Sequence, residues 1–143
     1  MSTRVLVLNG PNIDRLGSRE PEIYGSTTYN ELVELIDNSA RELGMSAEVR
    51  QSASESEIIS WLHEASDTST PVIFNPAAFT HYSYAIRDAC ALLTAPLIEV
   101  HISNPAAREE FRHTSVISAV ATAVIAGCGV RSYTLALRAL RDL

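Results

Sequence analysis

Short aliphatic runs alternate along the chain with segments whose apolar residues recur at helical spacing. Three of the runs predict strands, at residues 4–9, 71–75 and 96–101, and the more polar residues 45–51 are a weaker strand candidate. A strand that is buried on both faces of a parallel sheet reads as a continuous aliphatic run of this kind. The alternation of strands and helices therefore predicts an α/β fold built on a parallel sheet.

Capping residues mark where several of the helices are expected to begin. A side-chain oxygen at the N-cap accepts a hydrogen bond from an N–H group of the first turn that otherwise has no partner. The expected helices are one after the Thr28–Glu31 capping box, one capped by Ser54 or Ser56, one from Thr80 to about Leu93, a buried one over 116–126 and a last one over 132–143.

The length and the order of elements indicate a single domain over residues 1–143. A chain of 143 residues has the usual size of one domain and buries enough surface for a core. About five strands in a flavodoxin-like order would fit this size, as a three-layer sandwich with helices on both faces of a five-stranded parallel sheet. In such sheets, ligands bind beyond the carboxyl ends of the strands.

The composition excludes several kinds of chemistry. The chain has eleven basic residues and all of them are arginine, so it contains no lysine. No Schiff base can form through a side-chain amine, which rules out pyridoxal-phosphate chemistry, and the lysine of a P-loop NTPase is missing. The net charge of −6 disfavours general binding to nucleic acid or to an anionic membrane.

Metal and disulfide sites are also disfavoured. Cys90 and Cys128 are the only cysteines, which are too few for a disulfide framework. His81, His101 and His113 have neither the HxH nor the HExxH spacing of a metal site. We therefore expect no metal and no cofactor. The first residues run into the strand at 4–9 without a signal-peptide layout, so we expect a cytoplasmic location.

Polar side chains gather where three of the predicted strands end. The segment Asn9–Asn12 follows the first strand, Asn75–His81 follows the third, and Glu99–Asn104 closes the fourth. Because the carboxyl ends of parallel strands meet at one edge of a sheet, the three segments predict one shared site. Turn formation alone would account for any single segment, since Asn, Pro and Ser favour turns.

A polar stretch at residues 17–26, here called the lid segment, is bracketed by glycines and has no periodicity. We expect it to form a mobile lid over the strand ends. It contains Arg19 and Tyr24, and a guanidinium held beside a tyrosine favours the phenolate, which can act as a base. The structural alternative is that Tyr24 is a packing aromatic and Arg19 a solvated charge.

Two pairs have acid–base or anion-binding potential. Glu99 and His101 are two residues apart in a strand and therefore point to the same face, where a carboxylate would fix the imidazole tautomer and stabilise imidazolium. His81 follows the expected cap at Thr80, so it should lie in the first turn of a helix, with Asp88 near the same face two turns on. A structural pair and an exposed charge are the competing interpretations.

Arg108 and Arg112 would form an i, i+4 pair if their segment were helical. Two guanidinium groups on one helix face suit a carboxylate or another oxyanion. Alternatively, Arg108 pairs with the neighbouring Glu109 or Glu110 on a solvated face.

The candidate residues belong to long motifs that stand in a fixed order along the chain. The motifs are Val7-Leu-Asn-Gly-Pro-Asn12, Leu16-Gly-Ser-Arg-Glu-Pro21 with Tyr24-Gly25, Asn75-Pro76 with Thr80-His81, Ala85-Ile-Arg-Asp88, Ile98-Glu-Val-His-Ile-Ser-Asn104 and Arg108-Glu-Glu-Phe-Arg-His113. In type and order they resemble the type II 3-dehydroquinate dehydratases, over nearly the whole of residues 4–137.

The resemblance implies a flavodoxin-like domain that assembles as a homododecamer, a tetramer of trimers. It implies reversible dehydration of 3-dehydroquinate to 3-dehydroshikimate through an enolate, in the shikimate pathway of aromatic amino-acid biosynthesis. By matching position, Tyr24 would be the base and Arg19 would hold it as phenolate. Asn12 would help to bind the enolate oxygen. His101, aligned by Glu99, would protonate the departing hydroxyl.

The resemblance also implies which residues hold the substrate. They are Asn75, His81, Ile102, Ser103 and Arg112, with Asp88 reaching the site of a neighbouring subunit. The chain departs from the usual family pattern at positions that flank the site, namely Ala53, Ser56, Ala77, Phe79, Pro105 and Ala106.

Other functions on a flavodoxin-like fold fit the residues less well. A phospho-receiver domain would need acidic residues at the positions of Asn9, Asn12 and Asn75. A flavin-binding domain would need a phosphate loop of Ser, Thr and Gly where Gly10-Pro-Asn12 stands. A non-catalytic binding module has no need of an acid and a base, so Tyr24 and His101 disfavour it.

Overall fold

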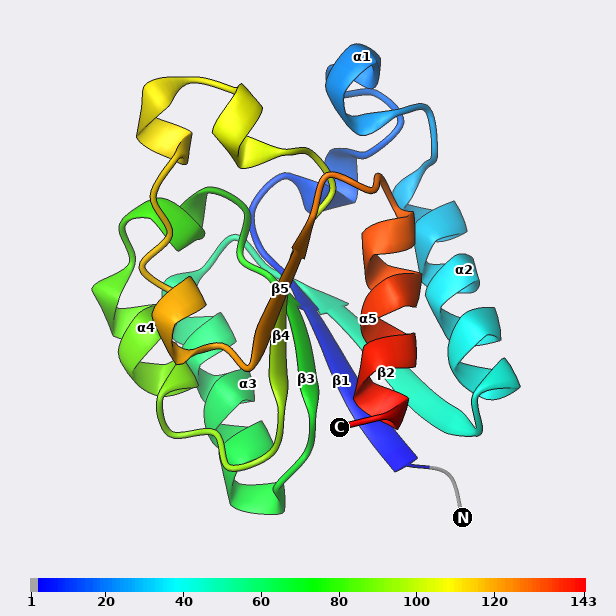
Figure 1. Cartoon of the computed structure of the whole chain (residues 1–143), viewed down its shortest axis with the longest axis vertical. Helices are drawn as coiled ribbons and strands as arrows, with labels where there is room; N and C mark the ends of the chain where they lie inside the picture. The colour runs from blue at the N-terminus through cyan, green and yellow to red at the C-terminus, as the bar shows by residue number, and fades with distance from the viewer. Residues whose placement is uncertain (1–2) are drawn as a thin grey trace.

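The computed structural model describes residues 3–143, in which five parallel strands form one sheet (Figure 1). Their order across the sheet is β2-β1-β3-β4-β5, and every neighbouring pair is parallel. This order confirms the predicted flavodoxin-like fold. The strands are β1 (Thr3–Asn9), β2 (Met45–Gln51), β3 (Val72–Asn75), β4 (Leu97–His101) and β5 (Ala123–Ala126).

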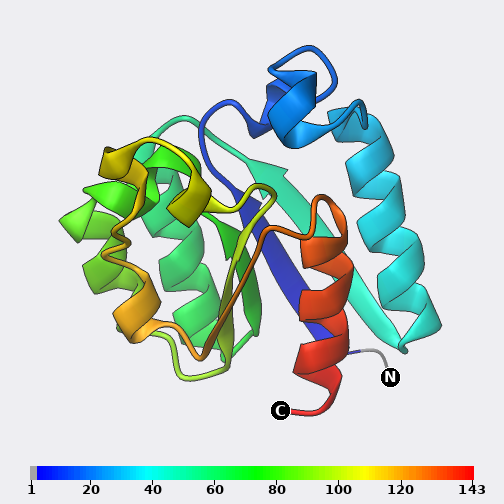
Figure 2. The ribbon, with the colours of Figure 1, turned by 45° about the horizontal axis from the view of Figure 1, so that its top comes forward.

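Helices cover both faces of the sheet and make it the middle layer of three (Figures 1 and 2). One face carries α2 (Tyr29–Glu42) and α5 (Arg131–Arg141), and the other carries α3 (Glu55–Thr68) and α4 (Tyr84–Cys90). The short helix α1 (Pro21–Tyr24) lies beyond the carboxyl ends of the strands. Within residues 3–143, no helix is long and apolar enough to cross a membrane.

Short 3₁₀ turns occupy several of the connections. They are η1 (Ile13–Arg15), η2 (Ala77–His81), η3 (Pro105–Ala107), η4 (Glu110–Arg112) and η5 (Ser118–Val120).

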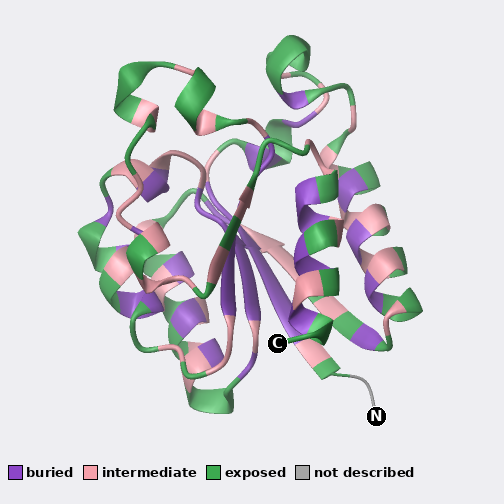
Figure 3. Cartoon of the chain, viewed as in Figure 1, coloured by how far each residue is buried: buried purple, intermediate pink, exposed green. Residues whose placement is uncertain are grey.

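The core lies on both sides of the sheet, as the interior strand β1 shows. Val5 and Val7 pack against α2 and α5, whereas Leu6 and Leu8 pack against α3 and α4. All four side chains are 0% exposed, and the central strands are buried along their length while the outer helix faces are exposed (Figure 3). Successive strand residues point to opposite faces, so a continuous aliphatic run is what a sheet covered on both sides requires.

Two of the predicted helix starts are confirmed. Thr28 accepts a hydrogen bond from the N–H of Glu31, whose carboxylate accepts from the N–H of Thr28, so the capping box at the start of α2 is complete. Ser54 accepts from the N–H of Glu57 and begins α3. These local signals sufficed because each cap uses only its own chain segment.

The predicted cap at Thr80 is wrong. Ser83 caps α4 by accepting from the N–H of Ile86, and the helix runs only over Tyr84–Cys90. The hydroxyl of Thr80 instead donates to the carboxylate of Glu99 at 2.7 Å. Leaving a buried carboxylate without a donor costs more free energy than leaving a helix N-terminus uncapped. His81 therefore lies in the turn η2 and not in the first turn of a helix.

The predicted buried helix over residues 116–126 is also wrong. The segment forms the turn η5 and then the strand β5, which pairs with β4 at the edge of the sheet. Along β5 the residues alternate between half-buried and exposed, with Val124 47% exposed. The apolar residues of this segment, which suggested a buried helix, belong in part to an edge strand that is covered on one side.

β1 and β3 approach each other closely at their carboxyl ends. The N–H of Gly10 donates to the carbonyl of Asn75 at 2.8 Å. A Cβ atom at position 10 would lie 2.3 Å from the carbonyl oxygen of Pro76, so only glycine fits there. The glycine brings the segment after β1 against the segment after β3, at the point where ligands bind in folds of this order.

On the outer side of β1 and β2, two arginines and two glutamates form a network of ion pairs. Glu64 on α3 accepts from Arg50 and from Arg4, both at 2.9 Å, and Glu48 lies beside both arginines. The hydrogen bonds from Arg50 and Arg4 lower the pKa of Glu64 to about 2. The network ties α3 to the edge of the sheet.

We expect Glu64→Gln to destabilise the fold at pH 7 by about 0.5–1 kcal/mol, because the network is partly exposed. The pKa of Glu64 in the folded chain lies below its ordinary value of 4.5. Its contribution is therefore complete above pH 4.5 and is lost as the pH falls toward about 2. Urea unfolding of wild type and variant at pH 7 and pH 3 measures the difference.

Glu57→Gln is the matched control, since Glu57 is exposed on the same helix and makes no ion pair within residues 3–143. A stability loss for Glu64→Gln that is equally large at both pH values would contradict the assignment.

Candidate active site

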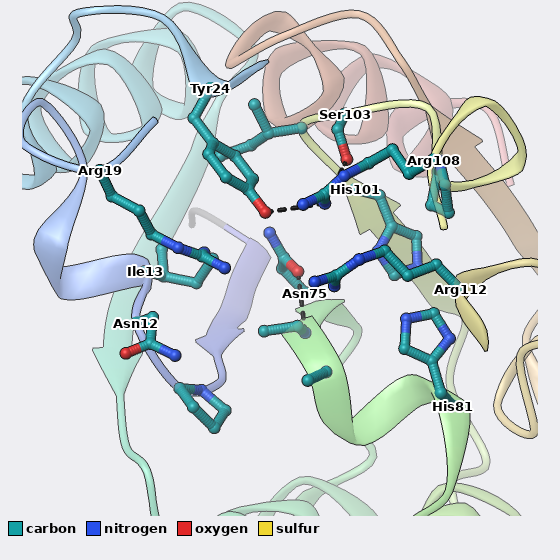
Figure 4. A pocket seen from close by; sticks show the side chains of 15 residues that line it. Asn12, Ile13, Arg19, Tyr24, Asn75, His81, His101, Ser103, Arg108 and Arg112 are labelled. Carbon is teal, nitrogen blue, oxygen red and sulfur yellow. Dashed lines mark hydrogen bonds between the residues drawn. The ribbon is translucent and has the colours of Figure 1, made fainter. Parts of the chain in front are cut away.

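A pocket lies beyond the carboxyl ends of β1, β3 and β4 (Figure 4). The space within it is about 470 Å³, part of it open to solvent. All three strand-end segments contribute, as the topology predicts. The lining residues are Pro11, Asn12, Ile13, Arg19, Tyr24, Asn75, Ala77, Ala78, His81, His101, Ile102, Ser103, Pro105, Arg108 and Arg112.

Tyr24 reaches the pocket from α1, in the lid segment, and is only 8% exposed. Its hydroxyl oxygen accepts a hydrogen bond from Nη1 of Arg108 at 2.7 Å. The guanidinium of Arg19 lies against the ring, 4.4 Å from its centroid. The expected pairing of Arg19 with Tyr24 is thus present, but the cation at the hydroxyl is Arg108.

Arg108 was considered in the sequence analysis only as a possible anion-binding partner of Arg112, and its contact with Tyr24 was not expected. Its side chain is 12% exposed. It donates to Ser103 Oγ at 3.2 Å as well as to Tyr24, and its Nη2 lies 3.7 Å from the carboxylate of Glu20. Arg108 therefore links the lid segment, through Glu20 and Tyr24, to the loop that follows β4.

The helix suggested by the spacing of Arg108 and Arg112 does not form. Arg108 directly follows the turn η3, which begins at Pro105, and Arg112 lies in the turn η4. Arg112 donates from Nε to Glu109 at 3.1 Å and still lines the pocket. The motif that contains both arginines was the one signal in the sequence for Arg108, since spacing alone cannot separate a buried arginine from a solvated one.

His81 lines the pocket from the turn η2 (Figure 4). Its Nδ1 lies 2.8 Å from the carbonyl oxygen of Thr114. Since a carbonyl only accepts, Nδ1 carries the hydrogen, and Nε2 is left for another partner. The contact ties the loop after β4 to the loop after β3.

Glu99 and His101 lie on the same face of β4 and touch, as their spacing predicts. Nε2 of His101 is 2.5 Å from Oε2 of Glu99, and the side chain of Glu99 is 0% exposed. Three hydroxyl groups, from Thr80, Ser115 and Ser118, also donate to this carboxylate.

These donors keep Glu99 ionised. Burial raises the pKa of Glu99, and the hydrogen bonds from His101, Ser118 and Thr80, together with the charge of His101, outweigh burial and hold the pKa below its usual value. A carboxylate only accepts hydrogen bonds, so Nε2 of His101 carries a hydrogen. The tautomer and orientation of the imidazole are thereby fixed.

Two asparagines line the pocket, one following β1 and one ending β3. Asn12 adopts a left-handed backbone conformation, with φ of 73°, directly after Gly10 and Pro11. Asn75 ends β3 and is 2% exposed. Both line the pocket, so each can offer an amide hydrogen-bonding group to a ligand.

Asp88 does not line the pocket of its own chain. It lies on α4 with its side chain 74% exposed and pairs with Arg87 at 2.9 Å. Because His81 is outside α4, the expected common helix face of His81 and Asp88 is not present. Ile102 and Ser103 do line the pocket, as do Ala77 and Pro105, two of the departures from the family pattern.

Metal ligands do not cluster in the part of the chain that the structure describes. No group of three or more His, Cys, Asp and Glu side chains in residues 3–143 could hold a metal ion. Burial raises the pKa of the Cys90 thiol to about 12, so that thiol stays protonated and unreactive at neutral pH.

The model of the family described as dehydroquinase class II matches residues 3–141. The chain belongs to the type II dehydroquinase family. It is 62% identical over 137 residues to a 3-dehydroquinate dehydratase of Salinispora tropica, covering 96% of each protein. It is 58% identical over 138 residues to a 3-dehydroquinate dehydratase of Mycobacterium tuberculosis, covering 96% of this chain and 94% of that protein.

Solved structures of type II dehydroquinases agree with the fold. The enzyme from Propionibacterium acnes superposes with a TM-score of 0.98 at 56% identity, covering 100% of this chain and 99% of the other. The enzyme from Butyrivibrio crossotus gives a TM-score of 0.95 at 44% identity, covering 97% of each chain. The architecture around the pocket is therefore that of a type II dehydroquinase.

We expect Ser118→Ala to destabilise this dehydroquinase by about 2 kcal/mol at pH 7, because a buried carboxylate loses a charge-assisted hydrogen bond. The lost contact is that from Ser118 Oγ to Oε1 of Glu99, at 2.6 Å. Thermal or urea unfolding measures the loss, with the exposed Ser60→Ala on α3 as control. Equal stability of the two variants would contradict a role for Ser118 in holding the charge.

Proposed function

We propose that the protein reversibly dehydrates 3-dehydroquinate to 3-dehydroshikimate through an enolate, in aromatic amino-acid biosynthesis in the cytoplasm, without metal or cofactor. One observation carries the proposal. A tyrosine hydroxyl held by a guanidinium and an imidazole held by a buried carboxylate share one pocket. Relatives named 3-dehydroquinate dehydratase, 62% and 58% identical, support the choice of substrate.

The reaction begins with removal of a proton beside the ketone. Tyr24, as phenolate, takes that proton, and the electron pair of the C–H bond moves to the ketone oxygen to give the enolate. Arg108 donates to the hydroxyl of Tyr24 and Arg19 lies against its ring, so two guanidinium groups stand beside the proposed base. An elimination next to a carbonyl needs such a base, an acid and a stabiliser for the enolate.

The pocket then stabilises the enolate, and loss of the hydroxyl converts it to the product. The amide of Asn12 helps to bind the enolate oxygen. His101 donates a proton to the departing hydroxyl, which leaves as water while the electron pair of the enolate forms the conjugated double bond. Glu99 steadies the imidazole through this step. Without lysine, an imine to the ketone through a side-chain amine is not available, so hydrogen bonds and charge must stabilise the anion.

The remaining pocket residues bind the hydroxyls and the carboxylate of the substrate. Arg112 and His81 stand on one side of the pocket, and Ser103, with the backbone of Ile102, follows β4. A guanidinium matches a carboxylate in charge and geometry. Asn75 binds from below, at the end of β3.

We further propose that the chain assembles as a dodecamer, a tetramer of trimers, in which Asp88 reaches the pocket of a neighbouring subunit. Strand β5 leaves an open sheet edge, and an uncovered edge carrying apolar side chains favours association. Asp88 is exposed and lies outside the lining of its own pocket, as such a role requires. Exposed large apolar side chains around these elements are Tyr82, Tyr84, Phe111 and Val124.

The proposed reaction is tested by mixing the protein with 3-dehydroquinate and following the ultraviolet absorbance of the conjugated enone product. We expect Tyr24→Phe to lower kcat about a thousandfold, because the base is lost. Circular dichroism checks that the fold persists. Tyr82→Phe is the matched control, since Tyr82 is 56% exposed and outside the pocket lining. No absorbance change with wild type would refute the function, and a Tyr24→Phe variant near wild-type kcat would refute the base.

The proposed assembly is tested by light scattering. We expect a dodecamer mass for the wild type, and smaller species for Val124→Asp, because a charge on an exposed sheet edge opposes pairing. A monomeric wild type would contradict the assembly without affecting the proposed chemistry.

A further inference from the structure

We propose that Tyr133 is a positioning residue for the reaction, because its hydroxyl fixes the side-chain amide of Asn75 so that an N–H group is offered to the pocket. Tyr133 itself does not line the pocket. The inference rests on the proposed function, in which Asn75 binds substrate. It assigns a role to a group on α5 that the proposed mechanism does not use.

Tyr133 joins the ends of two strands from within the core. The residue is 0% exposed in the first turns of α5. Its oxygen lies 2.6 Å from Oδ1 of Asn9 and 2.9 Å from Nδ2 of Asn75. Asn9 ends β1 and Asn75 ends β3, so one hydroxyl ties α5 to the two strands where the chain order of the sheet reverses.

Asn9, Tyr133 and Asn75 form a series of linked hydrogen bonds, and the backbone groups at its two ends determine the direction of each bond. The carbonyl of Arg50 only accepts, so Asn9 must turn Nδ2 toward it, at 3.3 Å, and Oδ1 toward Tyr133. The backbone N–H of Ala77 only donates, so Asn75 must turn Oδ1 toward it, at 3.0 Å, and Nδ2 toward Tyr133. The hydroxyl of Tyr133 therefore accepts from Asn75 and donates to Asn9.

This series of hydrogen bonds leaves Asn75 one group for a ligand, the second N–H of its side-chain amide. A flipped amide would place Nδ2 against the N–H of Ala77 and would set Oδ1 against a hydroxyl already donating to Asn9. One hydrogen on Nδ2 is used by Tyr133, and the second makes no hydrogen bond within residues 3–143. That N–H is what Asn75 offers, so the pocket selects a substrate oxygen with a lone pair, a hydroxyl or a carboxylate, at this position.

Burial of the hydroxyl is consistent with this role. Burial raises the pKa of Tyr133 well above its ordinary value, so the O–H stays protonated wherever the enzyme works. A phenylalanine would fill nearly the same space in the core. It would leave the Asn9 oxygen and one Asn75 N–H without partners, and a buried polar group without a partner is costly.

The decisive variant is Tyr133→Phe, assayed with 3-dehydroquinate. We expect KM to rise about tenfold with kcat changed by less than about threefold, because an interaction made equally with substrate and transition state is weakened. In an Asn75→Ala background the same substitution should leave KM unchanged, because coupling through Asn75 is then absent. Thr70→Val is the control, since it removes a buried hydroxyl that bonds Thr68 at the far end of β3.

Three results would overturn the proposal. The first is a lower melting temperature of Tyr133→Phe with KM unchanged, which would make the hydroxyl purely structural. The second is the same rise in KM with and without Asn75. The third needs no variant and no turnover: a neutron structure of the wild type in which the Tyr133 hydrogen points to Asn75 and not to Asn9. Absence of wild-type turnover would instead refute the proposed function, and the neutron measurement would still decide the orientation.

Discussion

The carboxylate of Glu99 has no exposed surface, and an ionised group in that position is stable only where donors surround it. The donors come from separate parts of the chain: His101 on β4, Thr80 in the turn after β3, and Ser115 and Ser118 ahead of β5. Satisfying one charge therefore holds these loops against the carboxyl end of β4. The same charge orients the imidazole of His101, so the path of the loops and the chemistry of the pocket have a common cause.

The parts of the fold that the sequence predicts are strands whose side chains are buried and helices whose capping contacts lie within one segment. The strands β1, β3 and β4 are aliphatic runs because they are covered on both faces, and α2 and α3 carry caps that use only their own segments. The failures share a different cause. Thr80 resembles a cap, yet its hydroxyl bonds to a residue nineteen positions away. The strand β5 is a short edge strand whose uncharged surroundings imitate a buried helix.

The contacts of the functional site also divide into those that the sequence predicts and those that it does not. Sheet topology brings the strand-end segments together, and the two-residue period of a strand brings Glu99 to His101, so both were predictable. The contact of Arg108 with Tyr24 was not, because it depends on how the chain turns through η3 and η4. Nor does the sequence indicate that Tyr133 meets Asn75, since the contact spans 58 positions and lies inside the core.

The contact between Tyr24 and Arg108 spans 84 positions and joins the lid segment to the opposite wall of the pocket. In the proposed mechanism this hydroxyl is the base, so the base and the guanidinium that contacts it come from opposite sides of the pocket. An outward displacement of the lid segment would separate them, so enclosing the substrate and assembling the base would be one step. Proton abstraction would then be confined to the interval in which the substrate is enclosed, without a separate control over when the base is formed.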